Sequence, residues 1–500
     1  MSRTRPLKIT GGRVLDSATG EAPLADLLIV DGAIDAIGEI SDGDFEILDA
    51  ADRLLMPGLI NSHTHAHGAL ARGAVDDRVP LELFLTSATA LNGNRSIEDK
   101  YLSAALSAVE MIRRGCTAAF DLFVEIPAPS VEGIRAVGQA YADAGMRAVV
   151  APMLADRTLY KAFPGLLDAI PEPHRAKAEA LSMQPFEASL ATAAKSIADW
   201  PFDKDYVRPG IAPTIPLHAS DDFLIAASRL ARETGLRFQT HLCESKPQAL
   251  AARTRYGCSM VEHLDRVGVL GPELSGAHGI WIDGDDIKRL ADKGCAVAHN
   301  PPSNLRLGSG VAPLREMLDS GLRVGIGTDA TNTSDGQNMF EAARLASYVS
   351  RLRGPDFARW VSAAEAFALA TEGSAALLGF DKIGKLAQGY AADIVFLRLD
   401  APNFVPFRNP LVQTVFGESG AAIDKVMIGG RPVFAEGKVL TLDEAKLRRR
   451  AEEAASRLDE TNGPAKSAAA EMSKFVGTFC LAHGAAPCPI HRRLPDAIRR

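Results

Sequence analysis

Two histidines, His63 and His65, stand one residue apart at the end of the apolar run that begins at Leu54. Side chains two positions apart on a β-strand point to the same face, so a strand here would place the two imidazoles side by side, as a shared metal ion requires. One such pair proves little in a chain of 500 residues. Its meaning depends on whether further metal-binding side chains occupy similar positions downstream.

Polar side chains do recur after later apolar runs. His241 ends one run and is followed three residues later by Glu244, while His278, His299 and Asp329 each follow another run. The chain has only 11 histidines, so this repeated placement indicates one shared site. Imidazole nitrogens and a carboxylate form a ligand set suited to Zn²⁺ or Fe²⁺.

The chemistry of such a site predicts a role for each residue. One divalent metal ion, zinc first and iron as the alternative, is expected on His63, His65, His241 and Asp329. It would lower the pKa of bound water toward about 7. Glu244 is expected to carry a proton from that water to a leaving group, and His278 to polarise the electrophile or steady the hydroxide. Asp329 has two possible roles, completing the ligand set or holding the attacking water, and is therefore predicted as catalytic as well.

Loops that follow the apolar runs are expected to shape a substrate pocket. The residues predicted to contact substrate are Arg72, Thr214, His299 and Asn304.

Elements that would bring these residues together can be predicted from the apolar runs. Helical patterns, such as 97–114 and 223–234, alternate with eight candidate strands, and repeated βα units predict an α/β fold with a parallel sheet. The eight strands fit a (β/α)8 TIM barrel, whose chemistry lies at the carboxyl ends of its strands. An open doubly wound sheet is the alternative, but it would carry a glycine-rich phosphate loop where His63 and His65 stand. The candidate strands are 54–62, 117–123, 146–153, 208–214, 236–242, 275–281, 295–299 and 323–328.

Both ends of the chain show short alternating runs, with Asp31-Gly32 as a hairpin signal. We predict a small β-sandwich domain from residues 1–56 plus 384–440 and a barrel domain from 57–383. Residues 441–500 are predicted to form a surface helix over 441–461, opened by a capping box at Thr441, and a poorly ordered tail. The tail contains Cys480, His483, Cys488 and His491, but the spacer between the two pairs is short for a zinc finger.

Composition restricts the partners. A net charge of −7 gives no basic field for nucleic acid or a membrane surface, and no signal peptide or transmembrane run is evident, which predicts a cytoplasmic protein. Six cysteines are too sparse for a disulfide framework, so Cys116, Cys243 and Cys295 are predicted to be buried free thiols.

Taken together, the motifs resemble the amidohydrolase superfamily over residues 5–440, in the branch of S-adenosylhomocysteine, guanine and pterin deaminases and triazine hydrolases. The motifs are Pro57-Gly58-Leu59-Ile60-Asn61-x-His63-x-His65, His241-x-x-Glu244, Gly276-Ala277-His278, His299-Asn300-Pro301-x-Ser303-Asn304 and Gly327-Thr328-Asp329. The resemblance implies one metal on His63, His65, His241 and Asp329, with Glu244 and His278 catalytic. It also implies a homodimer or higher homo-oligomer.

Two departures from the family pattern bear on this expectation. Binuclear relatives carry a carbamylated lysine at the end of strand four, and residues 212–216 contain no lysine. Adenosine-type deaminases tend to carry Pro-His where Pro213-Thr214 stands, so smaller heterocycles are expected to fit better than adenosine derivatives.

The function expected from these features is a metal-dependent aminohydrolase that releases ammonia from a small heterocycle such as a purine, pterin or triazine. One alternative keeps the same machinery but expels chloride, an alkylamine or an amide nitrogen. A catalytically silent binding subunit is another. Phosphoryl chemistry would require basic contacts near the site, for which Arg306 is the one obvious candidate.

Overall fold

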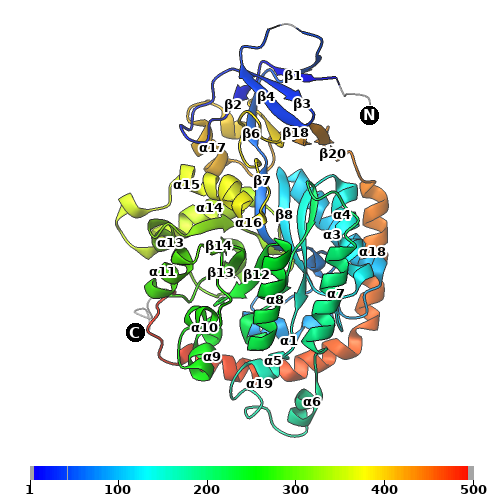
Figure 1. The fold of residues 1–500 in the computed structure, drawn as a ribbon, viewed down its shortest axis with the longest axis vertical. Coiled ribbons are helices and arrows are strands. Elements are labelled where there is room, and N and C mark those ends of the chain that lie inside the picture. The colour runs from blue at the N-terminus through cyan, green and yellow to red at the C-terminus, as the bar shows by residue number, and fades with distance from the viewer. Residues whose placement is uncertain (1–4, 42, 494–500) are drawn as a thin grey trace.

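Parallel strands form the centre of the molecule, and helices lie around them (Figure 1). This computed structural model describes residues 5–41 and 43–493, so residues 1–4 and 42 of the predicted β-domain and 494–500 of the predicted tail lie outside the described residues. Across the two described ranges, no helix has both the length and the apolar character needed to cross a membrane.

Two parallel sheets contain the strands that carry the predicted site. The first has the order β10–β9–β8–β7–β16, with β11 paired to β9, and the second has the order β12–β13–β14–β15. A bridge between Ile211 and Phe238 joins the two sheets, and Asp329 of β16 pairs with Thr64 of β7. The bounds are β7 Leu59–His65, β8 Cys116–Phe123, β9 Arg147–Leu154, β10 Val207–Pro209, β11 Ala212–Pro213, β12 Phe238–Leu242, β13 Leu274–His278, β14 Ala296–His299, β15 Arg323–Ile326 and β16 Asp329–Ala330.

Each of the eight predicted strand regions contains a strand, which confirms the α/β class and the parallel pairing. In the parallel sheets, β7 to β10 and β12 to β15 lie side by side in chain order, and β16 lies on the other side of β7. The strand predicted over 54–62 is divided at Gly58 into β6 (Arg53–Pro57) and β7. A Cβ on Gly58 would come 2.1 Å from Thr117 Oγ1, so glycine allows this close approach of β7 to β8.

Helices follow the parallel strands, and their ends match local capping chemistry. The helix predicted over 97–114 is present because Ser96 and Asp99 form a capping box at its start. The helix predicted from Phe223 begins two residues earlier, because the Ser220 side chain accepts the N–H of Phe223. The helices used below are α1 Leu81–Thr86, α2 Ala88–Asn92, α3 Ile97–Arg113, α4 Val131–Ala144, α6 His174–Ala180, α8 Asp221–Thr234, α9 Lys246–Tyr256, α12 Pro301–Arg306 and α14 Met339–Ser350.

Strands from the two ends of the chain pair with each other, as predicted. One sheet has the order β4–β3–β1–β5, and the other, β2–β6–β17–β18–β19–β20, joins the amino-terminal β6 to the carboxyl-terminal β17. The Asp31-Gly32 hairpin is confirmed, with positive φ at both residues. The bounds are β1 Leu7–Thr10, β2 Arg13–Val14, β3 Asp26–Val30, β4 Ala33–Gly38, β5 Glu46–Asp49, β17 Ile394–Arg398, β18 Ile423–Ile428, β19 Arg431–Ala435 and β20 Lys438–Val439.

A buried ion pair connects the terminal strands to the parallel sheets. The Arg147 guanidinium, at the start of β9, donates from Nε to Asp393 Oδ2 at 2.8 Å. Asp393 also accepts the N–H of Gly58 on its carbonyl and the N–H of Gly429 on its carboxylate. One aspartate therefore fixes three chain segments. The predicted buried free thiols, Cys116, Cys243 and Cys295, are confirmed.

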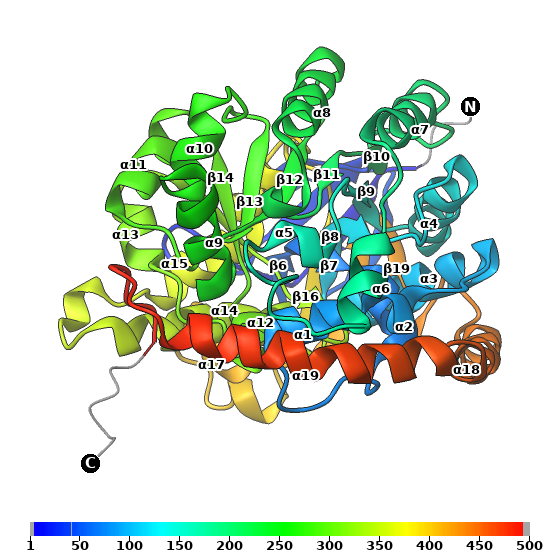
Figure 2. The same cartoon turned by 90° about the horizontal axis from the view of Figure 1, so that it is seen from below.

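The carboxyl-terminal region differs from the prediction in two ways. The helix predicted from Thr441 is α18 (Glu444–Thr461), which begins at the Asp443 cap because the Thr441 hydroxyl instead donates to the Ala144 carbonyl. The prediction of a poorly ordered tail is wrong, because residues Gly463–Ala485 form a second helix, α19 (Figure 2). Pro464 is tolerated in its first turn, where the missing N–H would have no helical partner, and the alanine-rich sequence favours a helix.

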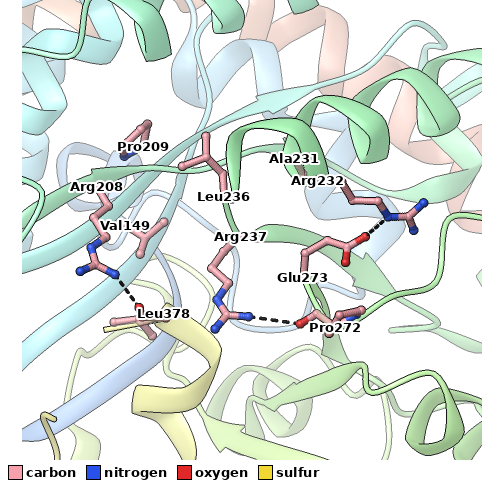
Figure 3. Close-up of a pocket in the computed structure, with 12 residues that line it drawn as sticks. Val149, Arg208, Pro209, Ala231, Arg232, Leu236, Arg237, Pro272, Glu273 and Leu378 are labelled. Carbon is pink, nitrogen blue, oxygen red and sulfur yellow. Dashed lines mark hydrogen bonds and ion pairs between the residues drawn. The ribbon is translucent and has the colours of Figure 1, made fainter. Parts of the chain in front are cut away.

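An open cavity of about 400 Å³ lies at the amino ends of β10 and β12 (Figure 3). Its arginines bind backbone carbonyls: Arg208 donates to Gly379, and Arg237 donates to Pro272 at 3.1 Å. None of the predicted site residues lines this cavity. It lies at the end of the strands opposite the histidines and is therefore separate from the predicted site.

Candidate active site

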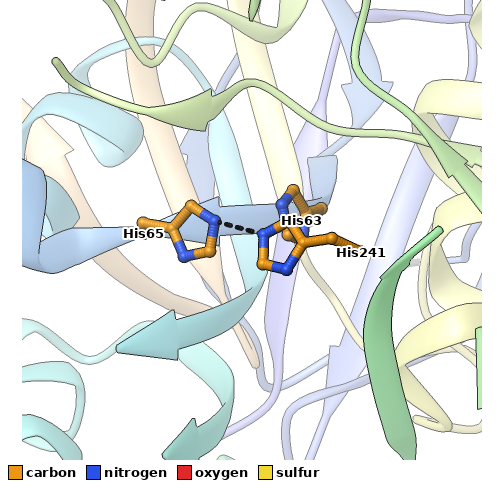
Figure 4. Close-up of side chains that lie close together, drawn as sticks. All are labelled: His63, His65 and His241. Atoms are coloured by element: carbon orange, nitrogen blue, oxygen red, sulfur yellow. Dashed lines mark hydrogen bonds between the residues drawn. The ribbon is translucent and has the colours of Figure 1, made fainter. Parts of the chain in front are cut away.

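Carboxyl ends of the parallel strands bring the predicted metal ligands together. His63 and His65 lie on β7, His241 on β12 and Asp329 on β16. The three imidazoles converge in Figure 4, with ring centroids 4.7 Å apart for His63 and His65 and 5.0 Å from each of these to His241. Residues far apart in the sequence therefore form one cluster.

Distances within the cluster fit a four-coordinate metal ion. His65 Nε2 lies 3.0 Å from His241 Nε2 and 3.1 Å from Asp329 Oδ1, and His63 Nε2 lies 3.5 Å from the same carboxylate oxygen. A tetrahedral zinc site with bonds of about 2.1 Å places its ligand atoms about 3.4 Å apart. Within the described ranges, the groups of side chains that could hold a metal are His63, His65 and His241, and His63, His278 and Asp329. The cysteines and histidines of the tail form no such group there.

Hydrogen bonds on the outer side of the cluster fix which nitrogen of each imidazole carries the proton. A carbonyl oxygen can only accept, so each bonded Nδ1 is the donor and each Nε2 presents a lone pair to the centre. Three lone pairs and a carboxylate meeting at 3.0 to 3.5 Å form a ligand set that suits a cation between them. The acceptors are Gln239 Oε1 for His63, the Leu122 carbonyl for His65 and the Thr214 carbonyl for His241.

Gln239 was not predicted as a site residue from the sequence, although its Oε1 accepts from His63 Nδ1 and orients that imidazole. Its amide nitrogen donates to the Ser62 carbonyl at 3.1 Å and to Ser275 Oγ at 2.9 Å, which turns Oε1 toward His63. The available signal was a polar residue in an apolar strand, two positions before His241 and thus on the same face.

Strained backbone accompanies the strand ends. Cys243, His278 and Asp329 all have positive φ, at 46°, 73° and 64°. A non-glycine residue pays about 1–3 kcal/mol for such a conformation, which persists only when surrounding structure imposes it. At Cys243 the turn separates His241 from Glu244 and directs both side chains toward the cluster.

Glu244 and His278 lie together beside the predicted ligands. His278 Nε2 is 3.5 Å from Glu244 Oε2 and 4.0 Å from Asp329 Oδ2, and Nδ1 bonds Asn304 Oδ1 at 2.8 Å. Burial, with the charges of Asp329 and Glu82 adding to it, raises the pKa of Glu244 well above its usual range, so this carboxyl readily holds a proton. Burial lowers the pKa of His278 to about 4, which keeps the imidazole neutral.

Asp329 is ionised, whereas Glu244 readily holds a proton. Burial alone would raise the pKa of Asp329, but the His63 and His65 imidazoles, whose Nε2 atoms lie 3.5 and 3.1 Å from Asp329 Oδ1, outweigh burial and hold the pKa well below the usual range. The Ser303 hydroxyl also donates to Asp329 Oδ2 at 2.5 Å. The site thus combines an ionised carboxylate at the cluster with a carboxyl beside it that readily takes a proton.

Several buried polar atoms at the site have no protein partner. Glu244 Oε1, His278 Nε2 and Asn304 Nδ2 are among them, as are both ring nitrogens of His299. Burying such atoms without a partner costs free energy, so their convergence fits a polar ligand. Burial lowers the pKa of His299 to about 3.

Predicted substrate contacts divide into two groups. Asn304 bonds His278, and Thr214 holds His241 through its carbonyl, so both lie at the cluster. The Arg72 guanidinium pairs with Glu110 of α3, and its side chain is 45% exposed. Contact of Arg72 with substrate stays a prediction.

Comparison with known proteins identifies the class. Residues 54–433, more than half of the chain, match the Amidohydrolase family, and the chain therefore belongs to this family. It is a hydrolase that acts on carbon–nitrogen bonds. The resemblance seen in the sequence motifs is confirmed.

Individual relatives narrow this class. The chain is 32% identical to the 5′-deoxyadenosine deaminase of Methanothermobacter thermautotrophicus over 457 residues, covering 90% of this chain and 98% of that one. It is 30% identical to the 5-methylthioadenosine/S-adenosylhomocysteine deaminase of Halothermothrix orenii over 440 residues, with coverages of 86% and 94%.

Solved structures similar to this fold include enzymes with zinc. An adenosine deaminase from Xanthomonas campestris with bound zinc has a TM-score of 0.79 at 25% identity, covering 90% of this chain and 98% of that one. The atrazine chlorohydrolase TrzN from Arthrobacter aurescens TC1, complexed with zinc, has a TM-score of 0.78 at 25% identity, with coverages of 90% and 100%.

Proposed function

We propose that this protein is a metal-dependent deaminase that releases ammonia from an amino-substituted nitrogen heterocycle by hydrolysis. The observation that carries the proposal is the convergence of three imidazole lone pairs and the Asp329 carboxylate beside Glu244. One divalent ion, with zinc as the first choice and iron as the alternative, would be held by His63, His65, His241 and Asp329. When bound, such an ion makes water available for attack at neutral pH.

The chain's own residues would handle the protons. Glu244 takes a proton from the attacking water and delivers it to the departing amine, and its raised pKa suits it to keep that proton in between. His278 donates its Nδ1 hydrogen to Asn304, so its Nε2 presents a lone pair and orients the attacking water. Of the two roles expected for His278, steadying the attacking oxygen therefore fits better than polarising the electrophile.

Adenine-ring compounds are the first substrate class to test, because the curated relatives are named as deaminases of 5′-deoxyadenosine, 5-methylthioadenosine and S-adenosylhomocysteine. These names weigh against the expectation, drawn from Thr214, that adenosine derivatives fit poorly. Pterins and triazines come next. A second candidate keeps the machinery and expels chloride, and the similarity to an atrazine chlorohydrolase favours it.

The test is ammonia release from a panel of purines, pterins, pyrimidines and triazines by zinc-loaded protein, compared with Glu244→Gln. We expect the variant to keep its zinc, measured by elemental analysis, and to lose about 10²–10⁴-fold in turnover, since a positioned proton carrier contributes that much. Release of ammonia from none of these compounds would refute the deaminase. Chloride release from chlorotriazines, lost in Glu244→Gln, would establish the second candidate. A biological function that the Glu244→Gln variant keeps in full, without any turnover, would instead point to a binding subunit.

Further features of the whole protein belong to the same proposal. The bridge at Ile211 and the pairing of β16 with β7 support a closed (β/α)8 barrel over residues 57–383. The pairing of β6 with β17 supports a β-sandwich domain from 1–56 plus 384–440. Absence of lysine in 212–216 supports a single ion. A cytoplasmic homodimer stays a prediction.

A further inference from the structure

Helix α19 lies below the parallel strands in Figure 1 and runs along one side of that end of the molecule in Figure 2, where it is red. It packs against α1 and α2, which follow β7, and against α9, which follows β12. It also reaches the region after β9: a Cβ on Gly165 would come 3.8 Å from the Phe479 ring, and the rings of His174 and Phe475 lie 5.3 Å apart. One helix thus contacts the segments that follow three parallel strands.

Residues after α19 extend this contact to two more strands. The Arg492 guanidinium donates to the carbonyls of Ile280 at 2.8 Å and Ile282 at 2.5 Å, in the loop after β13. The Arg492 carbonyl accepts the N–H of Val311 at 2.8 Å, in the segment after β14 and α12. Residues 463–492, called the roof below, therefore bind segments after β7, β9, β12, β13 and β14.

The roof lies next to the catalytic glutamate. Lys246, two residues after Glu244, donates from Nζ to the Gly484 carbonyl at 2.8 Å. Ser245, between them, bonds the buried Glu82 of α1. Because α1 packs on α19, the segment that carries Glu244 is held from two sides by elements in contact with the roof.

Residues of the site are closed off from solvent. Among the predicted ligands and catalytic residues, His241 is the most exposed at 7%, and His63 and His278 are fully buried. A substrate can reach Glu244 only if the groups above the cluster leave room for it. The loops that the roof binds follow β7, β12 and β13, which carry His63, His65, His241 and His278.

The roof also lies outside the region that defines the family. The family match ends at residue 433, before α18 and α19 begin. The alignment with the Methanothermobacter deaminase uses 98% of that protein but only 90% of this chain. This chain therefore has more residues than its relative, and the family match does not account for the roof.

We propose that the roof determines substrate specificity, admitting heterocycles with compact substituents and excluding those with long ones. The proposal rests on the proposed function for the identity of the reaction. By holding together the loops after β7, β12 and β13, including the segment that carries Glu244, the roof sets the upper limit on the size of the group attached to the reacting ring.

The test loosens the roof at two separate places with Arg492→Met and Lys246→Met. Each variant removes hydrogen bonds to backbone carbonyls while keeping an apolar stem. The readout is the ratio of kcat/KM for S-adenosylhomocysteine to that for 5′-deoxyadenosine, two compounds that share a ring and differ in substituent length. We expect this ratio to rise about tenfold in both variants, a change typical of steric discrimination in a pocket. Lys288→Met, at an exposed lysine paired with Asp292, is the matched control.

A second readout needs no substrate. The rate at which a chelator such as dipicolinate removes zinc from the loaded protein should rise about tenfold in both variants, because local opening controls access to a buried site. Labelling of Cys480, which is buried on α19, by a thiol reagent should rise with it.

Outcomes separate the two proposals. An unchanged substrate ratio in both variants, with the reaction itself observed, would overturn the role of the roof in specificity. Unchanged zinc release and thiol labelling would show that the roof does not close the site. If the wild-type protein releases ammonia from no compound of the purine, pterin, pyrimidine and triazine panel while zinc release still rises in the variants, the proposed function fails and the closure of the site by the roof stands.

Discussion

In each imidazole of the cluster, the carbonyl oxygen that accepts from Nδ1 fixes the proton on that nitrogen and leaves Nε2 with a lone pair. For His63 this acceptor is a side chain, Gln239, and can be changed without altering the backbone. Gln239 is in turn held by Ser62 and Ser275, so its amide cannot rotate freely. The orientation of one predicted ligand thus depends on a residue that touches no metal.

Gln239→Met should weaken zinc binding by about 10–100-fold, since loss of a partner that orients a metal-bound histidine has that effect. The measurement is competition with a chelator of known affinity. Gln139→Met, on the exposed face of α4 where Gln139 bonds Asp143, provides the control and should leave the affinity unchanged. Equal affinity in the Gln239 variant and the wild type would show that His63 needs no such partner.

At the scale of single residues, the sequence predicted those side chains whose spacing follows strand geometry. His63 and His65 converge because a strand repeats every two residues, and Glu244 was found through its distance from His241. The carbonyls of Leu122 and Thr214 could not be predicted, because every residue has a carbonyl and only the fold selects these two. The pairing of Arg72 with Glu110 could not be predicted either, because Glu110 comes from another element.

Secondary-structure elements were predicted well where apolar runs are continuous. β8 and β9 match their predicted ranges to within one residue, since buried parallel strands are apolar throughout. α19 was missed because its contact face combines alanine with scattered larger residues, Val476, Phe479 and Cys480, and gives little periodicity. Its stability depends on α1 and α9, which the local sequence does not reveal.

The short helix η2 (Pro216–His218), which contains His218, leads to a prediction about how the stability of the fold depends on pH. This helix buries the His218 ring against Phe163 and leaves its Nε2 without a partner. Burial, aided by the charge of Arg255, lowers the pKa of His218 from 6.5 to about 4. Between these two values the unfolded chain binds a proton that the folded protein does not, so acid destabilises the fold by about 1.4 kcal/mol per pH unit.

His218→Phe should therefore flatten the fall in stability of the zinc-loaded protein between pH 6.5 and 4, while keeping an aromatic ring in place. Urea unfolding at a series of pH values measures this slope. His491→Gln, at an exposed histidine, should leave the slope as in the wild type. A slope unaltered by His218→Phe would mean that His218 is already protonated in the folded state.

For the molecule as a whole, the joint between the terminal strands and the parallel sheets rests on Arg147 and Asp393. Both side chains are at most 7% exposed. Burial opposes the charge of Arg147, but Asp393 outweighs it and raises the pKa of the guanidinium. The sequence suggested that the two chain ends pair, yet nothing in it indicated this ion pair, which spans 246 positions.

Arg147→Met should cost about 3–5 kcal/mol of unfolding free energy, because it leaves the Asp393 carboxylate buried without its partner. The comparison is Arg175→Met, which removes an exposed pair with Glu172 and should cost at most about 1 kcal/mol. Adding Asp393→Asn to Arg147→Met should restore part of the loss. A cost below about 1 kcal/mol for Arg147→Met would place the stability of the joint elsewhere.

The pairing of Asp329 with Thr64 has a consequence for the order of events during biosynthesis. His63 and His65 leave the ribosome long before Asp329, and amino-terminal segments generally fold first during synthesis. The cluster cannot be complete until more than 260 further residues have been translated, since Thr64 and Asp329 are 265 positions apart. Before His241 is translated, a metal ion would meet only the His63 and His65 pair of the predicted ligands, so we expect capture by all four ligands to be a late step in maturation.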